Sequence, residues 1–329
     1  MPETPPNPAG SSVAGEFNQP LGGNEMPRFA GPGSLFRLPT QTSGAELDIA
    51  ICGVPLDVGT SNRPGARFGP RAIRAESVLV RPYGMHTGAA PFDSFQIADV
   101  GDVPLNTFSL EKSIGLIETF YDELLSYGVK PLSMGGDHTV ALPILRAIAR
   151  VHGPVALVHV DAHADVNDAM FGEPITHGTI FRRAIEEGLV DPHKMVQIGL
   201  RTTGYSAEDF DWSRNQGVQV VPAEDCWYRS LAPLMEQVRD RIGATTPTYL
   251  SFDIDGLDPS AAPGTGTPEP GGLMTSQGIE IIRGVWGLNL IGADLVEVAP
   301  AYDTTGNTAL LAANLLFEML CSFPGCIRR

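Results

Sequence analysis

The sequence predicts an α/β fold, a single three-layer domain in which a mainly parallel sheet is covered by helices on both faces. From Leu47 onward, apolar runs of strand length alternate with longer segments of helix length, which is typical of such a sheet. The 329 residues, 43% of them hydrophobic, suffice for one large core. No linker or internal repeat follows residue 45. We therefore expect an irregular arm over 1–45 and one folded domain over 46–329.

The predicted arm comes first and is rich in Pro, Gly, Ser and Asn without periodicity, so we expect it to be partly disordered. The run 48–54 is apolar and predicts the first strand. A long loop rich in Gly, Pro and Arg follows, and Pro70 is well placed to start a helix over 71–77.

An amphipathic helix is predicted over 110–126, with Ser109 as its N-cap and Gly128 just beyond its end. The strand 129–133 follows and leads into a helix over 139–151. The remaining elements continue the alternation, and we expect them in this order: strand 155–160, helix 179–187, strands 195–199 and 218–221, helix 232–241, strand 248–252, helix 276–285, strand 290–298 and helix 307–321.

The acidic balance of the chain narrows the possible partners and location. A formal net charge of -16 argues against a nucleic-acid or anionic-membrane partner. No apolar run reaches the length of a transmembrane helix, and the amino terminus lacks the basic segment and apolar core of a signal peptide. The four cysteines show neither zinc nor redox spacing. These features predict a cytoplasmic protein.

Potential metal ligands follow three of the predicted strands. They are two histidines and four aspartates: His138, Asp161, His163, Asp165, Asp253 and Asp255. Because parallel strands end at a common edge, we expect these side chains to converge in one crevice. Carboxylates offset the repulsion between two divalent ions, and carboxylates mixed with imidazoles suit Mn²⁺, Co²⁺, Ni²⁺ or Zn²⁺. The absence of cysteine from the cluster disfavours a structural zinc site, and Mn²⁺ is the first expectation.

Each of these short motifs also has an ordinary explanation, because a lone D-x-D or D-x-H is often a solvated turn. Three of them at three strand ends favour a metal site, since burying this many carboxylates without a cation would be costly. We therefore predict a binuclear metal site at the sheet edge.

Five motifs carry a resemblance to a known family. They are GGDH at 135–138, DAHAD at 161–165, HGT at 177–179, SFDIDGLDP at 251–259 and DLVEVAP at 294–300. Over residues 47–323 the chain resembles the ureohydrolases, which include arginases, agmatinases, guanidinobutyrases and guanidinopropionases. The resemblance implies a doubly wound, arginase/deacetylase-like sheet of eight strands, two Mn²⁺ ions, a guanidino substrate, and assembly as a homo-oligomer, a trimer or hexamer.

The resemblance also implies how the ligands divide between the two ions. One ion would be held by His138, Asp161, Asp165 and Asp253, and the other by His163, Asp161, Asp253 and Asp255. Asp161 and Asp253 would then bridge the pair.

Catalytic roles follow from the same resemblance. Two cations lower the pKa of water and so supply a nucleophile for the guanidinium carbon, with Asp165 as the proton carrier beside it. His177 would move a proton to or from the leaving amine, and Glu297 would pair with the guanidinium group. The ordinary alternative for His177 is a surface histidine in a loop, and the ordinary alternative for Glu297 is a side chain bonded to a neighbouring loop. Asp294 and His159 are expected to be structural.

The substrate must be distinguished by loops outside the metal cluster. Residues 166–176 lack the Ser/Thr-rich run with which arginases hold an α-amino acid. The segments 18–29, 167–172 and 204–210 resemble those of bacterial guanidinobutyrases. We therefore expect hydrolysis of 4-guanidinobutyrate to 4-aminobutyrate and urea.

Met170 is the candidate that measures substrate length, because a thioether packs against a longer methylene chain where guanidinopropionases usually place an aromatic ring. The alternative is that Met170 fills a gap in the core. Asn167 with nearby backbone amides, or Arg63 and Arg67, are candidates for binding the substrate carboxylate. The acidic chain slightly favours a cationic substrate such as agmatine, so agmatinase and 3-guanidinopropionase activities remain alternatives.

Two other classes of protein are compatible with the same fold. Deacetylases of the same fold use one zinc ion and lack the second set of ligands, so the presence of both Asp165 and Asp255 favours two ions. A metal-free oligomeric binding protein of this fold would be favoured by the loss of a ligand or of His177, and the sequence retains all of them.

Overall fold

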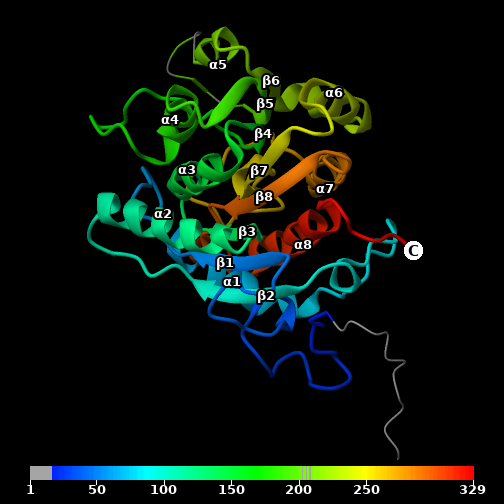
Figure 1. The fold of residues 1–329 in the computed structure, drawn as a ribbon. Helices are drawn as coiled ribbons and strands as arrows, with labels where there is room; N and C mark the ends of the chain where they lie inside the picture. The colour runs from blue at the N-terminus through cyan, green and yellow to red at the C-terminus, as the bar shows by residue number, and fades with distance from the viewer. Residues whose placement is uncertain (1–16, 202, 205, 207–208) are drawn as a thin grey trace, which may run out of the picture.

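The fold is built on one sheet of eight parallel strands in a computed structural model that describes residues 17–201, 203, 204, 206 and 209–329 (Figure 1). The strands lie in the order β2-β1-β3-β8-β7-β4-β5-β6, and every pairing between neighbours is parallel. Their bounds are β1 Ile49–Val54, β2 Ile97–Asp102, β3 Lys130–Gly135, β4 Val155–Val160, β5 Val190–Leu200, β6 Gln219–Pro222, β7 Pro247–Asp253 and β8 Asn289–Val296. The predicted fold class is confirmed.

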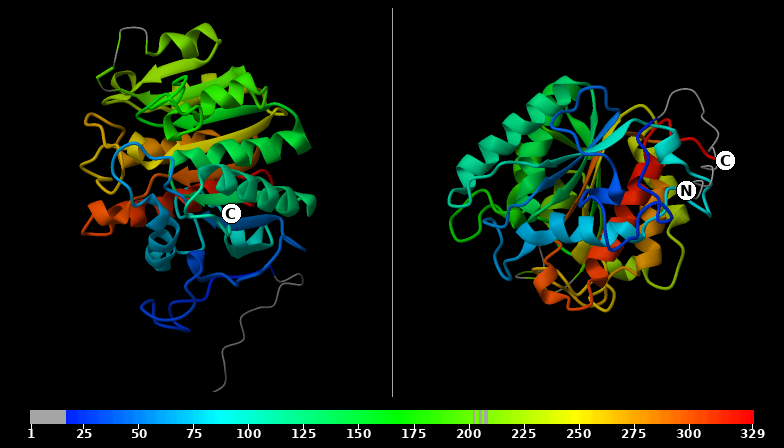
Figure 2. Two further views of the ribbon diagram at one scale, coloured as in Figure 1. Left: turned by 90° about the vertical axis from the view of Figure 1, so that its left-hand side faces the viewer. Right: turned by 90° about the horizontal axis from the view of Figure 1, so that it is seen from below.

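Helices cover both faces of the sheet (Figures 1 and 2). Helices α2, α3 and α4 pack side by side over one face, and α1, α8, α7 and α6 pack over the other. The bounds of the helices are α1 Gly69–Glu76, α2 Leu110–Ser126, α3 Ala141–His152, α4 Ile180–Glu186, α5 Asp211–Asn215, α6 Ala232–Ile242, α7 Thr275–Gly284 and α8 Asn307–Ser322.

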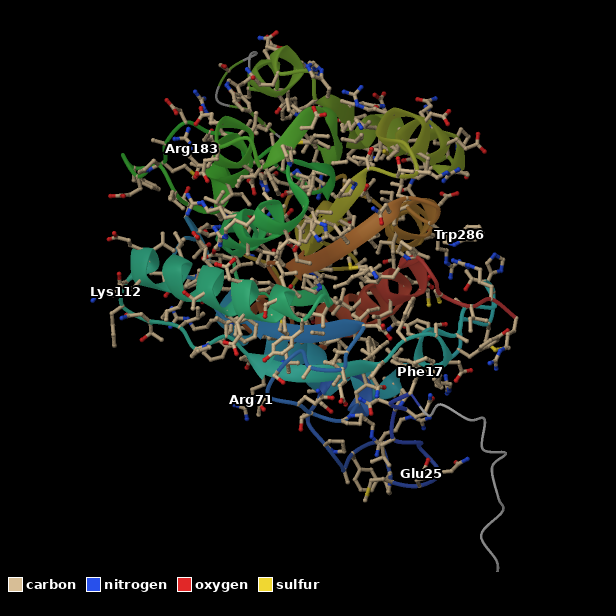
Figure 3. The ribbon with its side chains drawn as sticks, in the orientation of Figure 1. Phe17, Glu25, Arg71, Lys112, Arg183 and Trp286 are labelled. Atoms are coloured by element: carbon tan, nitrogen blue, oxygen red, sulfur yellow. The ribbon has the colours of Figure 1, made fainter. Side chains whose placement is uncertain are left out.

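The alternation of side chains along a buried strand produces the two cores. In β1, Ile49 and Ile51 join the core beneath α1, α6, α7 and α8, whereas Ala50 and Cys52 join the core beneath α2, α3 and α4. Because both faces are covered, all six residues of β1 are buried. Charged residues such as Glu25 and Lys112 lie at the periphery (Figure 3).

Strand β2 and the short helix α5 are absent from the elements that the sequence pattern predicted. Strand β2 contains Asp99 and Gly101, which interrupt its apolar run. The structure accommodates Asp99 in the interior because the guanidinium of Arg74 forms two hydrogen bonds with it, of 2.7 and 2.9 Å. A buried ion pair therefore replaces the apolar signal on which the sequence reasoning depended.

The described part of the predicted arm, residues 17–45, packs against the domain. Leu35, Phe36 and Leu38 are buried in the core beneath α1 and α8, and Asn18 donates to the carbonyl of Ile97 at the sheet edge. Residues 1–16 of the arm lie outside the described residues. No helix in the described part of the chain is long and apolar enough to cross a membrane.

Candidate metal centre

The predicted ligands meet at the carboxyl-terminal edge of the sheet. Asp161, His163 and Asp165 follow β4, Asp253 ends β7, Asp255 follows it, and His138 follows β3. Strand β4 lies beside β7, and β8 separates β7 from β3. Since these strands are parallel, their ends open into one crevice, which brings all six side chains together.

His138 lies at the centre of the first group. Its ring nitrogen Nδ1 is 3.1 Å from an oxygen of Asp161, 3.1 Å from one of Asp165 and 3.3 Å from one of Asp253. The imidazole is fully buried, and Nδ1 forms no hydrogen bond to any residue that the structure describes. A ring nitrogen that faces three carboxylate oxygens fits a cation, which would satisfy the nitrogen and the oxygens together.

Asp161 joins the first group to a second. Its Oδ2 faces His138, while its Oδ1 lies 3.3 Å from Nδ1 of His163, which is itself 3.2 Å from Oδ2 of Asp255. Side chains that could hold a metal therefore form two clusters that share Asp161: His138, His159, Asp161 and Asp165 in one, and Asp161, His163 and Asp255 in the other. Two clusters with one carboxylate in common fit the predicted binuclear site, whose division of ligands between the ions stays a prediction.

The electrostatics of the cluster also favour bound cations. Burial and the charges of neighbouring carboxylates raise the pKa of Asp253 and of Asp255. Burial also opposes ionisation of Asp161, but the imidazoles around it hold the pKa of its carboxyl well below the usual range. Several buried carboxylates in mutual repulsion are stabilised by divalent cations, so the donor set fits the predicted metal pair.

A chain of hydrogen bonds lies behind His138. Nε2 of His138 lies 2.8 Å from Oγ of Ser251, which donates to Asp294, and the hydroxyl of Tyr249 donates to the other oxygen of Asp294. With Nε2 protonated and Ser251 as its acceptor, Nδ1 keeps a free lone pair for a metal. Asp294 was predicted to be structural, and its carboxylate lies behind the predicted ligand His138, joined to it through Ser251.

His159 occupies a similar position behind Asp161. Its Nε2 is 2.8 Å from Oδ2 of Asp161, and Gln197 contacts its other ring nitrogen at 3.0 Å. His159 was predicted to be structural, and Gln197 was not among the predicted residues. The alternation of β4 places His159 and Asp161 on the same side of the strand, which is the signal that could have revealed the pair.

The predicted catalytic pair lies beside the cluster. Nδ1 of His177 is 3.3 Å from Oε1 of Glu297, and Nε2 is 2.7 Å from Oγ of Ser61. Burial alone would lower the pKa of His177, but Glu297 and the more distant carboxylates of Asp165 and Asp137 together raise it to about 9. The raised pKa favours the imidazolium, whereas the backbone N–H of Ser61, which donates to Nε2 at 3.2 Å, favours a ring with a lone pair on that nitrogen.

The loop after β1 supplies Ser61, which sequence reasoning missed. Asp137 holds this loop by accepting a hydrogen bond of 2.8 Å from the backbone N–H of Gly59. The carbonyl of Gly59 accepts in turn from the N–H of His177. Three segments far apart in sequence therefore position the imidazole.

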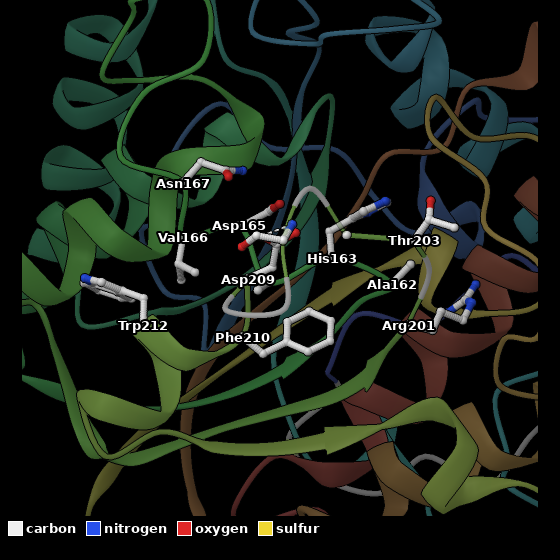
Figure 4. A pocket seen from close by; sticks show the side chains of 13 residues that line it. Ala162, His163, Asp165, Val166, Asn167, Arg201, Thr203, Asp209, Phe210 and Trp212 are labelled. Carbon is white, nitrogen blue, oxygen red and sulfur yellow. Dashed lines mark hydrogen bonds between the residues drawn. The ribbon is translucent and has the colours of Figure 1, made fainter.

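A cavity of about 300 Å³ opens beside the ligands (Figure 4). Its lining includes His163, Asp165 and the predicted substrate residue Asn167, together with Arg201 and Phe210. The exposed Asn167 side chain donates to the carbonyl of Gly178 at 3.0 Å.

The other candidates for binding the substrate tail lie outside this lining, as far as the described residues define it. The sulfur of Met170 packs over Gly178, where a Cβ atom would lie only 2.6 Å from it, so Met170 adjoins the HGT motif. Arg67 forms an ion pair with Asp57, and Arg63 stacks on the ring of Tyr302.

Comparison with known proteins places this geometry in a family. The family model described as "Arginase family" matches residues 47–321. The chain belongs to the arginase family. It is 65% identical to the guanidinobutyrase of Pseudomonas aeruginosa over 316 residues, which cover 95% of this chain and 99% of that protein. It is 57% identical to the mitochondrial agmatinase of Gallus gallus over 312 residues, with 95% and 92% covered.

Solved arginase-family structures share the fold. The proclavaminate amidino hydrolase from Streptomyces clavuligerus matches with a TM-score of 0.85 and 40% sequence identity, over 90% of this chain and 99% of that one. Membership of the arginase family confirms the predicted resemblance and the predicted class of enzyme. The roles assigned to single residues stay predictions.

Proposed function

We propose that this arginase-family chain is a guanidino-acid hydrolase that converts 4-guanidinobutyrate and water to 4-aminobutyrate and urea with two Mn²⁺ ions. The observation that carries the proposal is the pair of ligand clusters sharing Asp161 beside a cavity and a His177–Glu297 pair. The 65% identity to a guanidinobutyrase supports the choice of substrate.

The ligand clusters suggest which residues would hold the ions. His138, Asp165 and Asp253 would hold one ion, His163 and Asp255 would hold the other, and Asp161 would contact both; a bridging role for Asp253 also stays part of the proposal. When bound, the ions supply Lewis acidity, which lowers the pKa of water and offsets negative charge on the reacting group.

Glu297 is placed to orient the guanidinium. Its Oε1 accepts a 2.9 Å hydrogen bond from the backbone N–H of His138, and its Oε2 faces the backbone of Gly266. The carboxylate is therefore held in one orientation, and a guanidinium beside it would receive charge-assisted hydrogen bonds. Holding the planar carbon in one position is itself a catalytic contribution.

Proton transfer would then involve two further side chains. Asp165 accepts the proton lost by the attacking water, and His177 donates a proton to the amine nitrogen as the carbon–nitrogen bond breaks. The imidazolium form of His177 suits the second step, because the leaving amine departs as a neutral group once it is protonated. The urea carbonyl keeps the oxygen of the water.

The tail of the substrate would be read near Asn167 and Met170. Because Met170 packs over Gly178, directly after His177, a larger side chain at this position would intrude on the space beside the catalytic histidine. A difference of one methylene in substrate length is discriminated about 10–200-fold by such a pocket.

The proposal is tested by urea release from Mn²⁺-loaded protein with 3-guanidinopropionate, 4-guanidinobutyrate, agmatine and arginine. We expect the highest kcat/KM for 4-guanidinobutyrate, and we expect Met170→Tyr to shift the preference toward 3-guanidinopropionate by about tenfold or more. Clear preference for agmatine or arginine would overturn the substrate. If Met170→Tyr lowers only the thermal stability, Met170 fills space and does not measure length.

Three further properties belong to the same proposal. Mn²⁺ is favoured over Co²⁺, Ni²⁺ and Zn²⁺ by a donor set of four carboxylates and two imidazoles. Assembly as a trimer or hexamer and a cytoplasmic location stay predictions.

A further inference from the structure

A buried arginine at the end of β5 holds the backbone around the second ligand cluster. Arg201 is 3% exposed, and its guanidinium donates hydrogen bonds to backbone carbonyls. Nη2 lies 2.7 Å from the carbonyl oxygen of Asp255 and 2.7 Å from that of Glu269, while Nη1 lies 3.2 Å from those of Gly199 and Gly256. One side chain therefore joins β5 to two parts of the loop that follows β7.

This loop carries the groups that define the second cluster. The carboxylate of Asp255 accepts from the N–H of Ala162 at 3.2 Å and from the hydroxyl of Thr267 at 3.1 Å. A carboxylate oxygen of Glu269 lies 4.0 Å from Nε2 of His163, the ring nitrogen that points away from Asp255. Arg201 thus anchors the backbone of Asp255, which is one predicted ligand, and the backbone of Glu269, whose carboxylate faces the other ligand, His163.

The first cluster is supported in a different way. His138 is backed by Ser251 and Asp294, which belong to β7 and β8, and Arg201 makes no described hydrogen bond to any of these three residues. A change at Arg201 should therefore reach the two clusters unequally.

The choice of arginine follows from the number of carbonyls. A planar guanidinium presents five N–H groups in a fixed fork, whereas a lysine ammonium is a single point with three donors. A lysine at this position could contact the carbonyls of Asp255 and Glu269, which share Nη2, but it would lose the carbonyls of Gly199 and Gly256 that Nη1 holds. The conservative variant therefore keeps the charge and loses the part of the anchor made by Nε and Nη1.

We propose that Arg201 is a positioning residue for the second metal subsite, formed by Asp161, His163 and Asp255, and that it acts more strongly on the affinity for the second cation than on the affinity for the first. This inference rests on the proposed two-ion site. Residues that orient metal ligands from behind change metal affinity about 10–100-fold when they are replaced.

The test is titration of metal-free protein with Mn²⁺ by calorimetry, comparing wild type with Arg201→Lys. The matched control is Arg37→Lys, because Arg37 is 4% exposed and also donates to backbone carbonyls, those of Met26 and Ala30 in the arm. We expect Arg201→Lys to bind the first ion as wild type does and the second about 10–100-fold more weakly. Arg37→Lys should bind both ions as wild type does.

Electron paramagnetic resonance adds a readout that a general loss of structure would not produce. At a Mn²⁺ concentration that fills both subsites of wild type, Arg201→Lys should show isolated Mn²⁺ instead of a spin-coupled pair. Saturating Mn²⁺ should restore both the coupled signal and urea release. Wild-type affinity for both ions, equal weakening of both, or the same effect in Arg37→Lys would overturn the inference.

Two outcomes keep this inference separate from the proposed function. If wild type binds two ions but hydrolyses no guanidino compound, the proposed function fails and the unequal effect of Arg201→Lys still tests the inference.

If Arg201→Lys does not fold, Arg201→Gln replaces it, since a planar amide keeps two donors. Hydrogen exchange of residues 255–272 in the metal-free variant should then be faster than in wild type, and unchanged exchange would refute the anchoring role.

Discussion

Replacement of His177 by glutamine should separate catalysis from metal binding. The imidazole contacts Glu297 and Ser61, and it belongs to neither of the two ligand clusters. His177→Gln should therefore keep both Mn²⁺ ions and lose the proton donor for the leaving amine. The matched control is His152→Gln, because His152 is an exposed histidine at the end of α3.

The size of the loss follows from the protonation of His177. The raised pKa of His177, about 9, favours the imidazolium at pH 7, so the acid is available there. A positioned acid contributes about 10²–10⁴-fold to the rate, or about 3–5 kcal/mol of transition-state stabilisation. We expect a loss of that order in kcat for His177→Gln at pH 7.

The pH profile gives an independent check. The raised pKa means that the acid is present below pH 9 and is lost as the pH rises through that value. Bound cations would offset the charge of Asp165, one cause of the raised pKa, so the fall in kcat should lie at or below pH 9. The assay is urea release from pH 6 to 10 with metal content measured on the same samples. A variant with wild-type kcat, an unchanged high-pH limb, or fewer bound ions would refute this reasoning.

Two further predictions concern stability and charge. Arg74→Met leaves Asp99 buried without its partner and should lower the free energy of unfolding by about 3–5 kcal/mol. Arg150→Met breaks an exposed pair with Asp122 and should lower it by only about 0–1 kcal/mol. Equal midpoints of urea unfolding for the two variants would contradict this difference. Agmatine carries two positive charges, whereas the net charge of 4-guanidinobutyrate is zero. A chain of net charge -16 attracts the dication, and salt screens this attraction, so salt should lower kcat/KM for agmatine more than for 4-guanidinobutyrate. Stopped assays at about 0.01 and 0.5 M salt measure the two slopes, and equal slopes would exclude steering.

The ligands could be predicted because each one is adjacent in sequence to the strand that positions it. Asp161, Asp253 and their neighbours need only the rule that parallel strands end at one edge. Ser61 could not be found in this way, since its position depends on Asp137 holding a long loop through Gly59. Contacts between segments 78 and 116 residues apart leave no periodic signal in the sequence.

Arg201 was missed although a signal for it existed. It directly follows a strand, as the metal ligands do, and a charged residue at that place requires partners. Only side chains that can bind a metal were predicted at the strand ends, and arginine is not one of them. Its partners are backbone carbonyls of the loop after β7, which no side-chain motif reveals.

The end of β8 shows where local preference and function diverge. The predicted strand reached residue 298, but β8 ends at Val296 because Glu297 adopts a φ of 65°, a left-handed conformation that a strand cannot include. Asp165 has a φ of 52°, and such residues cost about 1–3 kcal/mol each. The N–H of Glu297 donates to Gly136 at 2.8 Å and the carbonyl of Asp165 accepts from Phe181, so surrounding structure holds both backbones. Glycine would relieve the strain at either position, and it would remove the carboxylate that the proposed chemistry needs there.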